Sequence, residues 1–437
     1  MDSFFALASL IFLNLVSEDF FMKKIRIGIF GSGSRGRSIA RTFMMLGCEI
    51  VAICENRECA RKESVEMLGN EVTVYENFSD FIEHDMDAVV LTNYFHEHAP
   101  YAIKCFERGL HVYSECISNG TMAEGVELVR AFEKSNSVYM LAENYPQMLF
   151  NREIKRICDS GTLGKILYAE GEYNHPGDPT DVKFKKMYNY YPEHWRNFLP
   201  RSYYITHSLG PVMWATGATP KRVTSFAAHA PMEGDVPVAC HVADKASIIT
   251  IQNDDGSIFR VTGCAAFGGH HNAYRVCGTK GTIENLRGMN GQVMLRYNDW
   301  EKPEGADEIK LYTPDWNDKD EDLIKQSGHG GGDYLTARMF VQCINENRQP
   351  EHPFNVYSAV AMSSVAILSH RSMLEGGVPY DIPDFRVAED CAKYENDRLS
   401  PFYLSDGTAP TLPCSSVTDY APTAKQLELY NKVISEF

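Results

Sequence analysis

The sequence has no hydrophobic run of membrane-spanning length, no CxxC cysteine pair and no basic tract. An apolar run from Phe4 to Val16 is too short to cross a bilayer. The twelve cysteines are scattered without a short-spaced framework, which is typical of free thiols in a reducing compartment. The formal net charge of -16 disfavours nucleic acid and anionic membranes as partners, because most of the surface would repel a polyanion. We therefore expect a cytoplasmic protein with neither kind of partner.

Residues 1-21 differ in character from the rest of the chain. Asp2 lies where an export signal carries positive charge, and no small-residue cleavage site is clear. Met22, followed by two lysines and a strand-like run, resembles a second start. We expect residues 1-21 to be an N-terminal extension without a role in the fold, and export by this segment stays the alternative.

The first part of the chain alternates short apolar runs with helical patterns. Strands are expected at Ile25 to Phe30 and Glu49 to Cys54, with a glycine-rich turn at Gly31 to Gly36 and a helix at Ser38 to Leu46 between them. The alternation continues to about Tyr145. It predicts a parallel sheet covered by helices on both faces, and hence a Rossmann domain over residues 22-145.

After about Tyr145 the pattern changes to longer strands with alternating side chains. Lys245 to Gln252 and Ser257 to Cys264 flank a turn that ends at Gly256, which predicts a hairpin in an antiparallel sheet. At 437 residues the chain is long enough for two cores. We therefore expect an α/β fold, in which residues 146-385 form a second domain with a large, mostly antiparallel open sheet. Residues 386-437 are expected to form a tail ending in an amphipathic helix.

The glycine-rich turn has the spacing of a dinucleotide-binding site. It follows a strand, opens a helix, and precedes Glu55 by nineteen residues. Glycines permit the tight turn, the helix N-terminus attracts the pyrophosphate, and an acid accepts bonds from the ribose hydroxyls. Glu55 favours NAD over NADP, while neighbouring Arg57 keeps NADP open. The cofactor contacts expected here are Gly31, Ser32, Gly33, Ser34, Arg35, Gly36 and Glu55.

From about Met22 to Phe385 the sequence resembles the Gfo/Idh/MocA oxidoreductases. The likeness includes Thr92-Asn93, His98, Gly109 to Val112 and Gly278 to Thr282. It implies a Rossmann domain, an open-sheet domain that commonly forms dimers, and thus a homo-oligomer. It also implies cofactor contacts from Asn93, His98, Glu115 and Glu143. One departure is Glu115-Cys116-Ile117, where many of these dehydrogenases have Glu-Lys-Pro with the lysine near the reacting hydroxyl.

A narrower resemblance is to the NAD-dependent glycoside hydrolases of this superfamily, best known as α-N-acetylgalactosaminidases. It is carried by Ala142 to Tyr145, Ala169 to His175, Tyr204 to Pro211, His329 to Tyr334 and Pro383 to Phe385. It implies transient oxidation at C3 of the sugar, elimination across C1 and C2, addition of water and re-reduction. Pro176 replaces an aspartate of those enzymes, so their aminosugar specificity does not carry over.

This resemblance implies roles for particular side chains. Tyr173 and His175 alternate along a strand, so both rings should face one side of it. We expect Tyr173 to take the C2 proton, and His207 with Tyr204 to act on the C3 hydroxyl or the leaving group; His175 is a further catalytic candidate. Trp195, Arg196 and His329 are the expected substrate contacts. Any of these side chains could instead serve only packing.

Two further interpretations stay open at this point. Glu143, His175 and His207 have donor types that suit Mn or Zn, so a divalent metal is possible. The chain could alternatively be an NAD-dependent sugar or cyclitol dehydrogenase, or a non-catalytic dinucleotide-binding protein. The lost lysine at Cys116 counts against the dehydrogenase, and the retained tyrosines and histidine count against a non-catalytic role.

Overall fold

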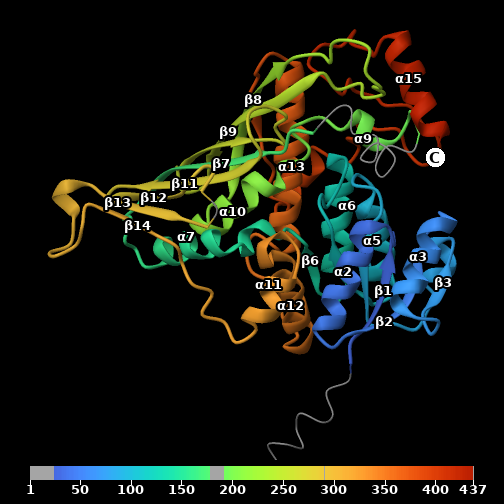
Figure 1. Ribbon diagram of the computed structural model, residues 1–437, viewed down its shortest axis with the longest axis horizontal. Helices are drawn as coiled ribbons and strands as arrows, with labels where there is room; N and C mark the ends of the chain where they lie inside the picture. The colour runs from blue at the N-terminus through green and yellow to red at the C-terminus, as the bar shows by residue number, and fades with distance from the viewer. Residues whose placement is uncertain (1–23, 178–190, 290, 437) are drawn as a thin grey trace, which may run out of the picture.

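The computed structural model describes residues 24-177, 191-289 and 291-436 (Figure 1). The N-terminal extension of residues 1-21 lies outside these ranges. Within them, no helix combines the length and the apolar character that a membrane span requires. Two sheets make up the framework, and helices from the C-terminal part of the chain lie between and across them.

The first sheet is wholly parallel, with strand order β3-β2-β1-β4-β5-β6. Its central strands are buried on both faces, as the run of fully buried residues at Ala88–Leu91 illustrates. The strands are β1 (Arg26–Phe30), β2 (Glu49–Cys54), β3 (Thr73–Tyr75), β4 (Ala88–Leu91), β5 (His111–Ser114) and β6 (Tyr139–Leu141), and the helices are α2 (Ser34–Met45), α3 (Glu58–Leu68), α4 (Phe78–Phe81), α5 (His98–Glu107) and α6 (Met122–Glu133). The predicted Rossmann architecture is confirmed.

The second sheet has strand order β14-β13-β12-β11-β7-β10-β9-β8-β15, and only the β7–β10 pair is parallel. The predicted open, mostly antiparallel sheet is therefore confirmed. Its strands are β7 (Ile166–Asn174), β8 (Pro220–His229), β9 (Asp244–Asn253), β10 (Ile258–Thr262), β11 (His271–Gly278), β12 (Gly281–Asn285), β13 (Val293–Tyr297), β14 (Ile309–Tyr312) and β15 (Tyr380–Asp381). Helices α7 (Leu149–Asp159), α10 (Thr206–Thr216) and α13 (Val356–Leu374) pack against the sheet.

The C-terminal helices connect the two sheets. Helix α12 (Gly332–Asn345) packs on α2, and its Phe340 meets the rings of Phe43 and Tyr113 in the Rossmann core. Helix α13 also contacts α6 of the Rossmann part. The remaining short elements are η1 (Tyr145–Gln147), α9 (Trp195–Phe198), η2 (Asp299–Glu301), α11 (Glu321–Gln326), η3 (His329–Gly331) and α14 (Ala388–Ala392). The predicted domain limits at Tyr145 and Phe385 stay predictions.

The tail beyond Phe385 packs over both parts of the molecule. The Asp397 carbonyl accepts a bond from the Ala123 amide of α6, and its carboxylate pairs with Arg371 of α13. The chain ends in α15 (Ala424–Ser435), whose Gln426 donates to the carbonyls of residues 232 and 234. The helix expected at the end of the tail is therefore present, and the tail is bonded to the body.

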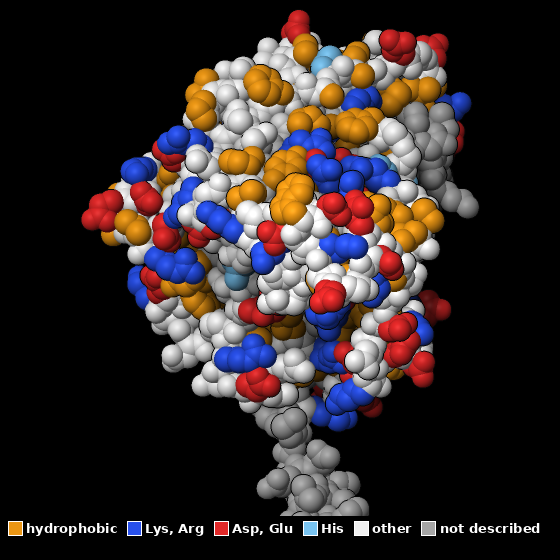
Figure 2. Space-filling model, turned by 90° about the vertical axis from the view of Figure 1, so that its left-hand side faces the viewer, with side chains coloured by type: hydrophobic (Ala, Val, Ile, Leu, Met, Phe, Trp, Pro, Cys, Tyr) orange, Lys and Arg blue, Asp and Glu red, His pale blue; other side chains and the backbone are white. Residues whose placement is uncertain are grey.

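Strands of the second sheet also carry exposed apolar side chains. Phe226 of β8 is 60% exposed, Leu311 of β14 52% and Leu167 of β7 50%. On the face that lies at the left of Figure 1, apolar side chains are interspersed with acidic and basic ones (Figure 2). Exposed apolar side chains on an open sheet can be buried against another protein surface.

Candidate active site

The glycine-rich turn leaves the start of α2 open to an anion. Gly31 has a φ of +91°, and a side chain there would lie 2.5 Å from the Thr92 carbonyl carbon. The N-cap residue of α2 is Gly33, which supplies no side-chain cap, and the first turn contains no acid. The amides of this helix N-terminus therefore suit a pyrophosphate. Because Gly33 occupies the N-cap position, α2 begins at Ser34 rather than at the predicted Ser38.

Two further residues expected at the cofactor lie along the carboxyl edge of the Rossmann sheet. Glu55 follows β2, is buried, and accepts bonds from the Arg57 amide and Nε, both at 3.1 Å. Asn93 follows β4; its amide nitrogen donates to the Glu97 carbonyl, while its buried oxygen has no partner among the described residues. That unsatisfied oxygen fits a ligand donor at this edge. His98 instead bonds the Ile117 carbonyl at 2.7 Å, and its side chain is buried at the start of α5.

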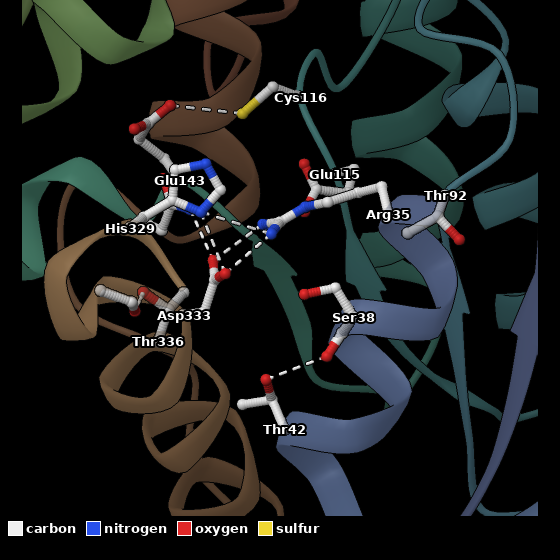
Figure 3. Close-up of polar contacts among 12 residues, drawn as sticks. Arg35, Ser38, Thr42, Thr92, Glu115, Cys116, Glu143, His329, Asp333 and Thr336 are labelled. Carbon is white, nitrogen blue, oxygen red and sulfur yellow. Dashed lines mark hydrogen bonds and ion pairs between the residues drawn. The ribbon is translucent and has the colours of Figure 1, made fainter. Parts of the chain in front are cut away.

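Arg35 lies on the same turn but is held by two carboxylates (Figure 3). Its Nε donates to Glu115 at 2.8 Å, and its two terminal nitrogens donate to the oxygens of Asp333 at 2.8 and 2.9 Å. Burial opposes the charge of Asp333, yet its bonds with His329 and Arg35 hold its pKa well below the ordinary value. Two of the predicted cofactor contacts, Arg35 and Glu115, thus bond each other, and the bond of Arg35 to Asp333 links α2 to α12.

Asp333 is a functional candidate that the sequence analysis did not single out. It also accepts bonds from Asn144 at 2.6 Å and from His329 Nδ1 at 3.0 Å, so both of its oxygens are saturated. His329 adopts a φ of +53°, which is uncommon outside glycine, and its ring lies 6.0 Å from that of Tyr145. The glycine-rich run before Asp333 was the available signal, but only the fold brings Arg35 to it.

The predicted catalytic residues His207 and Tyr204 form a chain with Glu143. Glu143 follows β6 and is fully buried; its carboxylate lies 2.9 and 3.0 Å from His207 Nδ1. The opposite ring nitrogen, Nε2, lies 3.1 Å from the Tyr204 hydroxyl. A carboxylate can only accept, so Nδ1 carries a proton; when the imidazole is neutral, Nε2 accepts the bond from Tyr204. The geometry is that of a carboxylate–imidazole–phenol proton relay.

Two additional donors orient the Glu143 carboxylate. The Tyr145 amide lies 3.1 Å and Cys116 Sγ 3.3 Å from its oxygens. Burial disfavours the charged form, but the charge and hydrogen bond of His207 keep the pKa of Glu143 below its ordinary value. Glu143 is therefore an ionised, fully bonded carboxylate. Cys116, at the position of the missing lysine, serves it as a hydrogen-bond donor.

Aromatic rings enclose the relay. Tyr145 stacks on His207 with ring centroids 3.9 Å apart, and Tyr173 meets the same imidazole edge-on at 4.9 Å. Burial, followed by Tyr204 and Tyr145, raises the pKa of Tyr173 above its usual value. Tyr173 is therefore a neutral phenol at ordinary pH. The sequence analysis did not assign Tyr145, although its place beside Glu143 was the available signal.

Other predicted site residues border this cluster. His175 lies parallel to Tyr173 at 5.6 Å, as strand alternation predicted, and bonds the exposed His270 at 2.9 Å. Trp195 stacks on Phe95 at 5.3 Å, and the Arg196 guanidinium lies 4.3 Å from the Trp195 ring. Their assignment as substrate contacts stays a prediction.

The structure gives no support to the Mn or Zn hypothesis. In the described ranges, no three His, Cys, Asp or Glu side chains form a group that could hold a metal. Glu143 and His207 bond each other directly, while His175 turns to His270. The three predicted ligands therefore do not converge.

Family models match almost the whole described chain. Residues 25–143 match the NAD-binding Rossmann fold of the oxidoreductase family, and residues 151–284 match the GFO/IDH/MocA C-terminal domain. The chain belongs to the Gfo/Idh/MocA superfamily. Residues 269–389 further match the glycosyl hydrolase 109 C-terminal domain. The chain is therefore an enzyme of an NAD-dependent family, and the non-catalytic interpretation is no longer needed.

Curated relatives and solved structures agree with this assignment. A glycosyl hydrolase family 109 protein of Streptomyces filamentosus is 26% identical, over 84% of this chain and 78% of the relative. Another, from Akkermansia muciniphila, is 25% identical over 83% of each. Levoglucosan dehydrogenase in complex with NADH and levoglucosan has a TM-score of 0.66 at 16% identity, covering 83% of this chain and 100% of that one. A myo-inositol 2-dehydrogenase from Lactobacillus plantarum has a TM-score of 0.62 at 20% identity, covering 82% and 100%. The structural likeness shows the fold.

Proposed function

We propose that this protein is an NAD-dependent glycoside hydrolase that oxidises its sugar transiently. The observation that carries the proposal is the Glu143–His207–Tyr204 relay, with Tyr173 against its imidazole, at the carboxyl edge of the Rossmann sheet. Ligands of doubly wound sheets bind at this edge. The glycine turn, Glu55 and Asn93 would hold NAD, which supplies reversible two-electron oxidation at C3 of the sugar.

The relay can accept the proton that the C3 hydroxyl loses when this carbon is oxidised. Tyr204 takes that proton while its own proton passes to His207 Nε2, and Glu143 stabilises the resulting imidazolium. The buried carboxylate also keeps the imidazole in the tautomer that accepts at Nε2. Re-reduction of the ketone runs the same transfers backwards, so no net proton is lost.

Tyr173 is assigned to the proton at C2. A C3 ketone acidifies this position, so that loss of the proton and departure of the C1 substituent become possible. Tyr173 can accept this proton only after its phenol has lost its own, and burial raises the pKa of that phenol, so the fraction in the accepting form keeps increasing as pH rises. We therefore expect elimination, rather than oxidation, to accelerate in alkaline solution.

The test follows 4-nitrophenol release from α- and β-glycosides together with NADH absorbance. Cleavage that NAD stimulates, without accumulated NADH, supports the proposal. In D₂O, the released sugar should carry deuterium at C2, because the proton removed there is replaced from solvent. Stoichiometric NADH from a free sugar, with no glycoside cleaved, would instead identify a sugar dehydrogenase. The homologous fold of levoglucosan dehydrogenase motivates this second candidate.

A further inference from the structure

Several basic side chains lie near the rings and strand ends that surround the relay, although the chain has a formal net charge of -16. We call Arg196, Arg201, Lys245, His175 and His270 the basic rim. The first three are half-buried and the two histidines are exposed. The arginines and the lysine of this set supply positive charge, and a local excess of it in an acidic protein creates a potential that attracts anions.

Arg196 is tied to the relay through a series of ring contacts. Its guanidinium lies 4.3 Å from the ring centroid of Trp195, which stacks on Phe95. Phe95 in turn meets Tyr204 edge-on at 5.5 Å. Burial, and then the charges of His270, His207 and Arg196, lower the pKa of His175. Arg196 therefore lies within electrostatic reach of the predicted catalytic side chains.

Arg201 extends the basic rim beside Cys264, since its backbone carbonyl lies against the neighbouring Gly263. Its Nε donates to the Asp244 backbone carbonyl at 2.9 Å. Burial raises the pKa of the Cys264 thiol, against the opposing charges of Arg201 and Arg196. Cys264 precedes Ala265, whose backbone amide donates to the Tyr173 carbonyl at 2.9 Å, so the segment beside Arg201 continues directly to the relay.

Positive charge at Arg201 and Lys245 is not neutralised by an ion pair within the described part of the chain. Burial and then Arg201 lower the pKa of Lys245, as expected of neighbouring cations. The nearest acid by sequence, Asp244, directs its carboxylate to Ser416 and His229 instead. Keeping two half-buried cations together without a carboxylate costs stability, which is understandable if they bind a ligand.

We propose that the basic rim binds an anionic substituent of the sugar, so that the substrates are acidic glycosides rather than neutral ones. Arginine forks recognise carboxylate and sulfate groups through paired, charge-assisted hydrogen bonds. Either a uronic acid or a sulfate ester supplies this chemistry. The inference rests on the proposed function, because the rim selects substrates only if the relay beside it is the reacting group.

The test compares 4-nitrophenyl glucosides and galactosides with the matching uronides and 6-sulfates, as both anomers. We expect kcat/KM for one anionic class to exceed that for the neutral glycosides at least tenfold, and the class identifies the substituent. Arg201→Gln should lower that value about tenfold or more while leaving neutral glycosides within about threefold. Arg222→Gln is the matched control, because Arg222 is exposed on β8 and pairs with Asp381.

A measurement on the unaltered protein covers the case in which Arg201→Gln does not fold. Raising NaCl from about 0.05 to 0.5 M should raise KM for the anionic class and leave KM for neutral glycosides unchanged, because salt screens exposed charge. Equal kcat/KM for all classes, or equal losses in Arg201→Gln, overturns the inference while the hydrolase proposal stands. NADH formed stoichiometrically from free uronic acids, without glycoside cleavage, refutes the hydrolase and leaves the basic rim supported.

Discussion

Asp333 bonds Arg35 through both carboxylate oxygens, and so joins the turn at the start of α2 to the start of α12. The same carboxylate accepts from Asn144, next to Glu143, and from His329. One buried side chain therefore sets the relative positions of the dinucleotide turn, the strand end that carries the relay and a predicted substrate residue. Displacement of any one of these groups should therefore shift the positions of the others.

Replacement of Asp333 should destabilise the protein strongly. Asp333→Asn leaves the Arg35 charge with only Glu115, and loss of one partner of a buried ion pair costs about 3–5 kcal/mol. Because the folded pKa of Asp333 is depressed, its stabilisation is complete above the ordinary value of about 3.9 and is lost as pH falls below it. Urea unfolding at pH 7 and pH 3 measures both effects, and the difference between variant and parent should be about 1 kcal/mol smaller at pH 3 than at pH 7.

Asp381→Asn is the matched control for this variant. Asp381 pairs with Arg222 on an exposed part of the second sheet, where ion pairs contribute up to about 1 kcal/mol. An Asp333→Asn protein as stable as Asp381→Asn at pH 7 would show that the contacts of Asp333 carry little energy.

Substitution of Tyr204 and substitution of Tyr173 should impair different chemical steps. Tyr204→Phe removes the hydroxyl that bonds His207, so single-turnover formation of NADH should slow by about 10²–10⁴-fold. Tyr173→Phe should retain that first burst but lose glycoside cleavage and C2 deuterium incorporation. Stopped-flow absorbance and NMR of the product measure the two steps.

Tyr168→Phe supplies the control on the same strand, β7, because Tyr168 bonds Glu170 away from the relay. Its rates should equal those of the parent. Equal losses of both steps in Tyr173→Phe and Tyr204→Phe would contradict the division of labour between them.

Cys116 should be chemically inert in the folded protein. Burial, followed by the charges of Glu143 and Glu115, raises the pKa of its thiol, and alkylation requires the thiolate. Cys59 is exposed and should react first. Iodoacetamide treatment with peptide mass mapping should therefore modify Cys59 at pH 8 and reach Cys116 only after denaturation. Rapid native labelling of Cys116 with loss of activity would contradict the buried thiol-to-Glu143 bond.

His370 should contribute to the sensitivity of the fold to acid. Its buried ring donates from Nε2 to the Pro413 carbonyl at 2.7 Å, and burial lowers its pKa from 6.5 to about 4. The unfolded chain binds a proton in this interval and the folded chain does not, so stability falls as pH decreases from 6.5 to 4. The loss amounts to about 3 kcal/mol at about 1.4 kcal/mol per pH unit.

His370→Gln should flatten this dependence, because glutamine does not titrate. Thermal melts of both proteins between pH 4 and pH 7 give the comparison. Parallel pH profiles of the parent and the variant would mean that His370 has the same pKa in the folded and unfolded chains.

The second sheet should mediate self-association. Leu167, half-exposed on β7, would be covered by a second copy. Sedimentation should give a mass above that of one chain, and Leu167→Glu should lower it. Val74→Glu, at an exposed site on the Rossmann edge strand β3, should not. Sedimentation of the parent protein as a single chain would contradict the prediction of a homo-oligomer.

The sequence was sufficient for elements whose pattern is local. A strand, a glycine turn and a helix within thirty residues predicted the dinucleotide site, and alternation on β7 placed Tyr173 and His175 on one face. Such features depend on backbone geometry and side-chain period, which neighbouring residues determine.

Tertiary structure alone decided which distant side chains meet. Glu143 and His207 were both predicted site residues, yet their separation along the chain gave no sign that they bond each other. The sequence alone also allowed a metal site with His175, which these described residues do not form. Arg35 was assigned to the cofactor from its motif, but the packing of α12 on α2 brings Asp333 to it from 298 residues away. Local sequence determines where a side chain points along its own element, whereas the docking of elements determines its partner.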